Sequence, residues 1–312
     1  RQGARQCRGL YRSASRLARP LDRATVATVP YGVDSYRLLS WSRMPPFFLP
    51  KSLLSIALAA MALPLTAHAA TPAIDPLTQP IASPYAAQWN RPQQPARIHG
   101  DTYYVGVGGL SVVLIDTRAG LILIDGALPQ SVAAIKEHIL ELGFRLEDIK
   151  FILNTEAHFD HSGGIAALAR DSGAQVVASP LGAEALRAGA VLAADPQAGE
   201  IDPMPAVENV REIADGETLQ LGEVTVTARY TPGHTPGGLS LYGEGVVFSG
   251  DTLFRYSVGR TDLYGGSSDI LLDSIEKKLL TLPDDTVVLP GHGPATTIGD
   301  ERMGNPFLDG GW

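Results

Sequence analysis

The feature that most constrains this chain is a set of polar turns, each of which follows a short apolar segment. The first turn, TEAHFDHSGG, places His158 and His161 after the segment Phe151–Asn154. The other turns are TPGHTPGG with His234, SGDT with Asp251 and PGHG with His292. Short apolar segments that end in Gly or Pro are typical of buried strands. We therefore expect a sheet-based fold in which these turns converge on one site.

Strands and helices are expected to alternate along most of the chain. Apolar or alternating segments predict strands at 102–107, 111–116, 121–125, 151–154, 174–179, 218–221, 224–230, 239–242, 246–249 and 287–289. Helical spacing of apolar residues predicts helices at 129–142, 164–170, 181–188 and 269–282. The acidic, proline-containing segment 189–214 is expected to be a surface loop near the site. Strands that cluster in each half, with helices between and after them, predict an α/β protein, an αββα sandwich of two mixed sheets with helices on the outer faces.

The N-terminal part predicts an export signal over residues 44–69. This segment begins at Met44, carries Lys51 before the apolar run SLLSIALAAMALPL, and ends in the small-x-small sequence Ala67-His68-Ala69. The apolar run is shorter than the roughly 20 residues that a membrane span needs. We expect a cleaved signal peptide, a periplasmic protein and no membrane span after cleavage. A retained N-terminal anchor is the alternative.

Three further segments complete the predicted organisation. Residues 1–43 are rich in Arg and are interpreted as an upstream translated, disordered segment, with a genuine basic arm as the alternative. Residues 70–97 contain six prolines and predict an extended lead-in, in which Trp89 contacts the domain surface. Residues 98–312 are expected to form the functional domain. The only cysteine is Cys7, so residues 70–312 contain neither a disulfide nor a thiol nucleophile.

The charge of the chain is unevenly distributed. Residues 1–69 hold ten of the 25 basic residues but only two of the 33 acidic residues, which leaves residues 70–312 with a formal charge of −16. A strongly acidic body argues against nucleic acid or an anionic membrane surface as a partner. It is compatible with a small-molecule substrate and with a cationic cofactor. The oligomeric state is not predicted.

The segment 156–161 places four candidate metal ligands within six residues. Imidazole and carboxylate together suit Zn, Fe or Mn. Because consecutive side chains point in different directions, Asp160 and His161 can serve a different metal from Glu156 and His158. Two metals about 3.5–4 Å apart can share a hydroxide and act on both the attacking and the leaving group. Asp251 is the expected carboxylate bridge between them.

This segment resembles the His-x-His-x-Asp-His signature of the metallo-β-lactamase superfamily, with Glu156 where the first His normally stands. The pieces TPGHTPGG, SGDTLF and PGHG follow in the order and spacing of that family. The resemblance implies a metallo-hydrolase domain over 98–312 with two Zn²⁺ ions, and Fe or Mn as alternatives. It implies that Glu156, His158 and His234 hold one metal, that Asp160, His161 and His292 hold the other, and that Asp251 contacts both. Asp160 would also act as the catalytic residue that orients the nucleophile and moves its proton.

Two subfamilies are visible within the resemblance. Residues 89–235 resemble subclass B3 β-lactamases, whereas residues 239–300, with VVFSGDTLFRYSVGRTDLYGGS, resemble short glyoxalase II-like hydrolases. The first likeness implies a zinc-dependent β-lactamase that opens an amide or lactam bond with a bridging hydroxide, with a role in antibiotic resistance. The second implies a hydroxyacylglutathione thioester hydrolase, which is the alternative. Asp251 favours the alternative, because B3 enzymes usually carry Ser there. A non-catalytic metal-binding scaffold is a further alternative.

Glu156 changes the expected charge of the site. Three carboxylates, a hydroxide and two divalent cations sum to a neutral centre, which predicts a weaker Lewis acid and better tolerance of Mn or Fe than in a His-rich site. Arg260 and Tyr256 are candidates for the substrate mouth, and an Arg260–Asp262 structural ion pair is the competing interpretation. His68, His99 and His138 are not expected to take part in the site, and His138 is expected on the exposed face of its helix.

Overall fold

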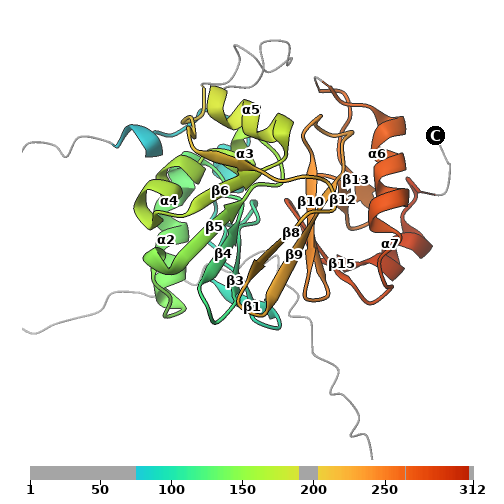
Figure 1. The fold of residues 1–312 in the computed structure, drawn as a ribbon. Coiled ribbons are helices and arrows are strands. Elements are labelled where there is room, and N and C mark those ends of the chain that lie inside the picture. The colour runs from blue at the N-terminus through green and yellow to red at the C-terminus, as the bar shows by residue number, and fades with distance from the viewer. Residues whose placement is uncertain (1–74, 190–202, 264, 309–312) are drawn as a thin grey trace, which may run out of the picture.

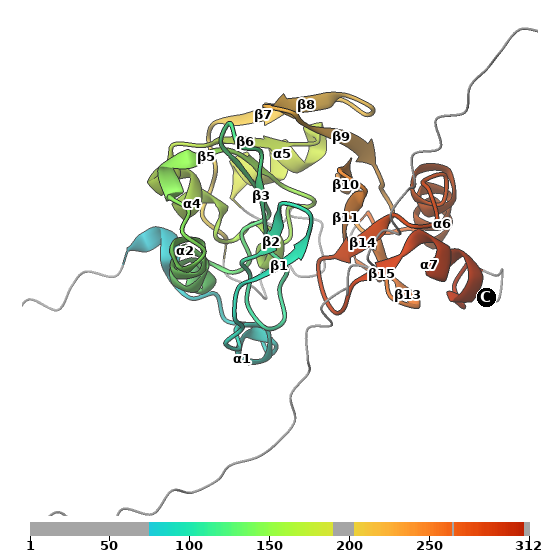
Figure 2. The ribbon, with the colours of Figure 1, turned by 90° about the horizontal axis from the view of Figure 1, so that it is seen from below.

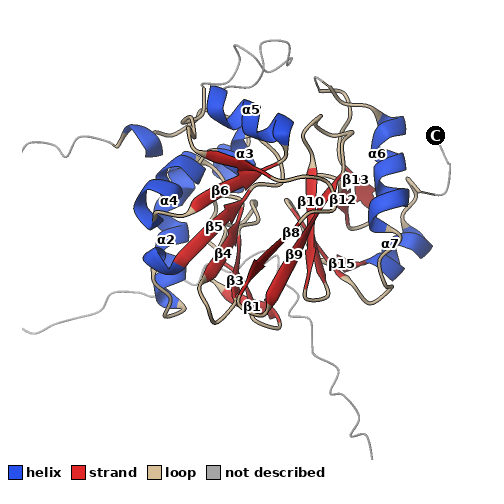
Figure 3. Ribbon diagram, viewed as in Figure 1, coloured by secondary structure: helices blue, strands red, loops and turns tan. Residues whose placement is uncertain are grey.

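The computed structural model describes residues 75–189, 203–263 and 265–308. The predicted upstream segment 1–43 and signal peptide 44–69 lie outside the described residues, as does the first part of the lead-in. Across the described ranges, no helix is both long and apolar enough to cross a membrane. The chain is drawn in Figure 1, and its helices and strands are distinguished in Figure 3.

Two mixed sheets form the centre of the fold. The seven-stranded sheet has the order β1-β2-β3-β4-β5-β6-β7 and the six-stranded sheet the order β15-β14-β11-β10-β9-β8. The first consists of β1 (Ala96–His99), β2 (Thr102–Tyr104), β3 (Val113–Asp116), β4 (Leu121–Ile124), β5 (Ile149–Leu153), β6 (Gln175–Ala178) and β7 (Val210–Glu212). The second consists of β8 (Thr218–Leu221), β9 (Val224–Tyr230), β10 (Leu239–Gly243), β11 (Val246–Gly250), β14 (Val287–Pro290) and β15 (Thr296–Thr297). A hairpin of β12 (Leu253–Phe254) and β13 (Ser257–Val258) is separate from both sheets.

Helices cover the two outer faces, as Figure 2 shows from below. The outer face of the first sheet carries α2 (Val132–Glu141), α3 (Phe159–Ser162), α4 (Ile165–Ser172) and α5 (Pro180–Ala188). The second sheet is covered by α6 (Ser268–Ser274), which continues as the π-helix η4 (Ile275–Leu279), and by α7 (Ile298–Gly304). Short elements precede or connect these: η1 (Pro76–Thr78), α1 (Ala86–Trp89), η2 (Pro129–Ser131) and η3 (Leu146–Asp148).

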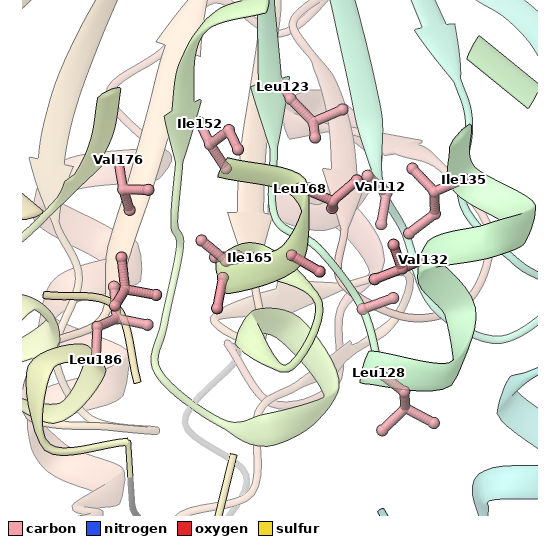
Figure 4. Packing of buried hydrophobic residues seen from close by; sticks show 14 of the residues in the cluster. Val112, Leu123, Leu128, Val132, Ile135, Ile152, Ile165, Leu168, Val176 and Leu186 are labelled. Carbon is pink, nitrogen blue, oxygen red and sulfur yellow. The ribbon is translucent and has the colours of Figure 1, made fainter. Parts of the chain in front are cut away.

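Three hydrophobic clusters correspond to the three interfaces between these four layers. The first lies between the helices and the seven-stranded sheet and includes Ile135, Ile152 and Leu168, which Figure 4 shows packed together. The second, with Ile122 and Phe248, fills the space between the sheets. The third, with Ile275 and Val288, lies under α6 and η4. The predicted αββα sandwich is therefore confirmed.

Several segments differ from the expectation. The described part of the lead-in is not simply extended, because it contains η1, α1 and the first half of β1, and Trp89 packs against the first cluster. The expected surface loop 189–214 includes β7, the edge strand of the first sheet, and buries Met204, Val207 and Ile213. His138 was expected to be exposed but is buried, and its Nδ1 lies 3.0 Å from the carbonyl oxygen of Val105. These segments are short or polar and gain their structure from long-range pairing.

Strand direction places the polar turns together. The chain leaves β5, β9, β11 and β14 directly into the turns that hold the predicted ligands. Strands β4 and β5 are parallel, as are β11 and β14. Ligands bound at the carboxyl ends of strands are a general property of such α/β layers. The turns from both sheets meet at one edge of the sandwich.

Candidate metal centre

The turn after β5 supplies the first four predicted ligands. Glu156 and His158 lie in the loop before α3, while Asp160 and His161 lie within this short helix. Ser162 Oγ donates a hydrogen bond of 2.7 Å to the carbonyl oxygen of His158, which tightens the turn. All four ligand side chains are buried. The helix thus presents Asp160 and His161 to a different part of the centre from the loop that precedes it.

The first ligand group joins Glu156, His158 and His234. Glu156 Oε2 lies 3.0 Å from His158 Nδ1 and 3.1 Å from His234 Nε2. The two imidazole nitrogens are 3.2 Å apart. Two rings and one carboxylate therefore point at a common position, and they come from β5 in one sheet and β9 in the other.

The second ligand group joins Asp160, His161 and His292. Asp160 Oδ2 lies 3.2 Å from His292 Nε2 and 4.0 Å from His161 Nε2. In each group the donor atoms all lie within 4.8 Å of one another. The two groups share no residue, so each has its own three ligands.

Asp251 lies between the two groups. Its Oδ1 is 3.3 Å from His161 Nε2, and its Oδ2 is 3.5 Å from His292 Nε2 and 3.8 Å from His234 Nε2. The carboxylate therefore faces imidazoles of both groups, which is the position expected of a bridge. A further grouping of Glu156, His161 and Asp251 satisfies the same distance limit. The seven predicted ligands form one continuous cluster.

The donor set fits metal ions. Glu156 Oε2, His161 Nε2 and Asp251 Oδ1 are buried, and although other atoms of the cluster lie close to them, none of these contacts has the geometry of a hydrogen bond. A buried polar atom without a partner costs free energy unless something else satisfies it. Imidazole nitrogen and carboxylate oxygen in groups of three are the ligands of Zn, Fe and Mn. The cluster therefore indicates a metal cofactor.

The electrostatics of the protein alone also favour cations. Burial disfavours the charged imidazoles, but the carboxylate of Glu156 raises the pKa of His234 to about 9. Burial is likewise outweighed at His292, where Asp251 and Asp160 raise the pKa to about 9. At Asp160 burial would raise the pKa, but His161 and His292 lower it to about 2. Burial would raise the pKa of Glu156 as well, but His234 and His161 lower it, so Glu156 and Asp160 stay ionised and attract positive charge into the centre.

Outer contacts orient the imidazoles. His234 Nδ1 lies 2.7 Å from the carbonyl oxygen of Arg260, and His292 Nδ1 lies 2.9 Å from that of Gly109. Such contacts fix the tautomer that leaves Nε2 for a metal. Arg260 therefore touches the centre through its backbone, a role that no sequence pattern indicates.

Asp125 is a functional residue that sequence reasoning missed. It is buried, it has a φ of 61°, and its carboxylate accepts hydrogen bonds from the Thr155 N–H, the Thr155 hydroxyl and the Asn154 amide. Asp125 Oδ2 also lies 3.3 Å from His161 Nδ1. It therefore holds both the ligand-bearing turn and one ligand ring. Its place in the sequence LIDGALP, directly after an apolar strand, was the available signal.

Close backbone packing surrounds the ligands. A Cβ at Gly291 would lie against Cε1 of His161 and 2.5 Å from Oδ1 of Asp251. A Cβ at Gly250, where φ is +50°, would lie 2.8 Å from the Thr155 hydroxyl oxygen. Glycine is needed at both positions because the strand ends approach the centre too closely for a side chain.

A cavity of about 960 Å³ opens over the centre. Trp89, Phe254 and Arg260 are among the residues that line it, together with Asp160, Asp251 and three ligand histidines. Arg260 is exposed and forms two hydrogen bonds of 2.7 Å with Asp262, so the pair lies at the surface of the cavity and is not buried. Tyr256 is not among the lining residues. Its N–H donates instead to Glu301, at 2.8 Å.

Comparison with known proteins supports this geometry. The family model described as "Metallo-beta-lactamase superfamily" matches residues 105–292. A solved structure described as the first B3 metallo-beta-lactamase with an active-site glutamic acid has a TM-score of 0.65 and 40% identity, over 76% of this chain and 94% of that chain. The predicted resemblance to subclass B3 enzymes is confirmed.

Curated relatives also match. An uncharacterized protein of Mycobacterium leprae is 54% identical over 112 residues, which are 35% of this chain and 50% of the relative, so the match spans half of that protein. The hydroxyacylglutathione hydrolase GloC of Haemophilus influenzae is 33% identical over 168 residues, which are 52% of this chain and 77% of the relative. The predicted resemblance to a thioester hydrolase is therefore also matched by a known relative.

Proposed function

Since this chain belongs to the metallo-beta-lactamase superfamily of hydrolases, we propose that it opens an amide or lactam bond as a B3-like metallo-β-lactamase with two zinc ions. The observation that carries the two-metal part of the proposal is the position of Asp251, whose carboxylate lies between the ligand groups and faces His161 and His292 of one and His234 of the other. Similarity to a B3 enzyme with an active-site glutamic acid supports Glu156 as a ligand.

Glu156, His158 and His234 would hold one metal ion, and Asp160, His161 and His292 the other, with Asp251 shared. When bound, the metal ions supply Lewis-acid activation of water and of the substrate carbonyl. Iron or manganese are alternative occupants, because the chain offers three carboxylates among seven ligands.

Asp160 is the proposed catalytic residue. It lines the cavity, and its Oδ2 faces His292. The other oxygen, Oδ1, would accept the proton that the attacking water loses and return it to the leaving group, as a general acid–base does. Trp89 and Phe254 would exclude water from one wall of the cavity during this transfer.

A hydroxyacylglutathione-type thioester hydrolase is the second candidate. It is favoured by Asp251, which stands where B3 enzymes usually carry Ser, and by the likeness to the Haemophilus influenzae hydrolase. The cavity cation Arg260 is paired with Asp262, so it is a poor anchor for the carboxylate of a β-lactam. The same pairing would weaken an ion pair with the carboxylates of a glutathione thioester, so it does not separate the two candidates.

Parallel assays of the zinc-loaded protein test the two candidates. A chromogenic cephalosporin and a lactoyl-glutathione thioester would be compared at matched concentrations, with metal content measured in the same sample. We expect turnover of the cephalosporin, and loss of turnover in Asp160→Asn even at a zinc concentration that fills both sites. Turnover of the thioester alone would reverse the assignment. Turnover of neither, with two metals bound, would make the protein a metal-binding scaffold.

A further inference from the structure

We propose that Glu301 is a positioning residue for the substrate cavity, and that the wall it supports selects substrates with a planar apolar group beside the scissile bond. Glu301 lies on α7, outside the metal centre, and it contacts no predicted ligand. It acts through the β12–β13 hairpin, which carries Phe254. The selectivity part of this inference rests on the proposed hydrolase function.

Glu301 is a fully buried carboxylate that joins three segments. Its Oε1 accepts a hydrogen bond of 2.6 Å from the Thr296 hydroxyl. Its Oε2 accepts hydrogen bonds of 2.8 Å from the Tyr256 N–H and from the Asn305 side-chain amide. Its exposed fraction is 0%, and each of these three donors is neutral. A buried carboxylate is costly unless donors satisfy it, so its contacts fix these segments relative to one another.

The hairpin depends on this contact at its turn. Leu253 pairs with Val258 and Phe254 with Ser257, which leaves a two-residue turn, Arg255-Tyr256. Tyr256 has a φ of 56°, a conformation that a bulky L-residue adopts only when its surroundings hold it there. Glu301 receives the N–H of this strained residue.

Asn305 holds the second arm of the same hairpin. Its side-chain amide donates a hydrogen bond of 3.0 Å to the carbonyl oxygen of Ser257 and another hydrogen bond to Glu301. Asn305 is only 1% exposed. Figures 1 and 2 place the hairpin beside α7, so the C-terminal helix and the hairpin form one supported unit.

The supported hairpin places an aromatic wall at the metal centre. The rings of Phe254 and Trp89 lie 6.4 and 5.5 Å from the ring of His292. Both rings line the main cavity and a neighbouring cavity of about 300 Å³, which Ser257 also lines. The boundary between the two cavities is therefore aromatic on both sides of His292. A flat apolar group next to the reacting carbonyl would stack there.

The substitution Glu301→Met tests the coupling. Methionine keeps the length of the side chain and removes both acceptors, whereas Glu301→Gln can keep one oxygen for Tyr256 and Asn305 and turn its amide toward the Thr296 hydroxyl, which can accept. Thr296→Val is the matched control, because it removes a hydrogen bond to the same carboxylate on the side away from the hairpin. We expect Glu301→Met to displace the ring of Phe254, and Glu301→Gln and Thr296→Val to leave that ring in place.

The kinetic readout uses two matched substrates, a phenylacetyl and an acetyl derivative of the same leaving group. In Glu301→Met we expect KM for the phenylacetyl compound to rise about 3- to 10-fold, the size of an aromatic contact, with kcat and metal content retained. KM for the acetyl compound should stay within about twofold on the same scale. In a Phe254→Leu background, Glu301→Met should cause no further selective rise.

A spectroscopic readout separates this inference from the proposed function. In protein labelled with 4-fluorophenylalanine, the ¹⁹F resonance that disappears in Phe254→Leu reports the wall without any turnover. It should shift or broaden in Glu301→Met and stay in place in Thr296→Val. If no carbonyl substrate is hydrolysed, the proposed function fails while this resonance still tests the hairpin.

Three outcomes would overturn the inference: an unmoved Phe254 resonance in Glu301→Met, an equal rise of KM for both substrates, or the same selective rise in the Phe254→Leu background. If Glu301→Met does not fold, Asn305→Ala decides. This substitution removes the contact with Ser257 and should cause the same resonance change and the same selective rise of KM. An unmoved resonance in folded Asn305→Ala would equally refute the proposal.

Discussion

The backbone N–H of Asp251 donates a hydrogen bond of 3.1 Å to Oε1 of Glu156. This contact joins the turn after β11 to the turn after β5, and so links the two sheets at the centre. It also occupies one oxygen of Glu156, while Oε2 remains directed at His158 and His234. Glu156 is therefore arranged to offer a single oxygen to the first ligand group.

Replacement of Glu156 tests its effect on the metal centre. Glu156→His supplies a nitrogen ligand and removes one of three negative charges, so we expect tighter zinc binding and faster cephalosporin hydrolysis. Glu156→Gln is the matched control, since it keeps an acceptor for the Asp251 N–H but turns a non-ligating amide toward His158 and His234. It should lower zinc affinity by at least about tenfold. Zinc titration and the chromogenic assay measure both effects, and a His variant without gain in either contradicts the charge argument.

Asp125→Asn should weaken metal binding although the substitution replaces none of the candidate ligands. The amide would place N–H groups against at least one of the donors from Thr155 and Asn154, and it would no longer support His161 through a charge. Loss of such outer contacts typically lowers metal affinity about 10- to 100-fold. Competition with a chelator measures the change. Asp116→Asn, at the end of β3, is the control and should bind zinc like the wild type.

Gly291→Ala should disrupt the second ligand group. The added methyl group would meet both His161 and Asp251, and overpacking of this kind typically costs about 1–3 kcal/mol. We expect elemental analysis to find about one metal ion less per chain, at a zinc concentration at which the wild type keeps its full metal content. Gly216→Asn, at a remote turn with φ of +80° and open space around it, serves as the control. Full metal content in Gly291→Ala would show that the backbone can adjust.

Acid should remove the contribution of Asp215 to stability. Partial burial raises the pKa of this carboxyl, but the hydrogen bonds from Lys278 and the Tyr230 N–H lower it below the ordinary 3.8. A carboxyl whose pKa is lower in the folded protein stabilises it above the unfolded-state pKa, and this contribution is lost as pH falls through the folded-state value. The Tm of Asp215→Asn should therefore lie below that of the wild type at pH 7.

The pH profile of this difference is the test. The gap in Tm between the wild type and Asp215→Asn should narrow as pH falls below about 4. Asp285→Asn, at an exposed position, provides the comparison and should follow the wild type throughout. A gap that stays constant down to pH 2.5 would mean that the contact of Asp215 does not depend on its charge.

The sequence by itself predicted most strands of both sheets and the polar turns that follow four of them, but not β1, β7, β12, β13 or β15. The local pattern of a segment such as Val224–Tyr230 predicts a strand without any tertiary information. A turn such as PGHG predicts both the end of a strand and a candidate ligand. The αββα layers could be predicted because apolar faces at these spacings need partners on both sides. The seven candidate ligands could be named because their residue types, order and spacing resemble the signature of a known metallo-hydrolase family.

Only the tertiary structure decided how outside residues support this centre. Strand β7 has three residues and pairs with β6 from a segment that looks like a loop, and His138 is buried through a contact with Val105, 33 residues away. Asp125, Gly291 and Glu301 act through neighbours that are distant along the chain. Local pattern reports which residues prefer strand, helix or turn, whereas packing at one sandwich edge depends on contacts between distant segments, and no local pattern encodes them.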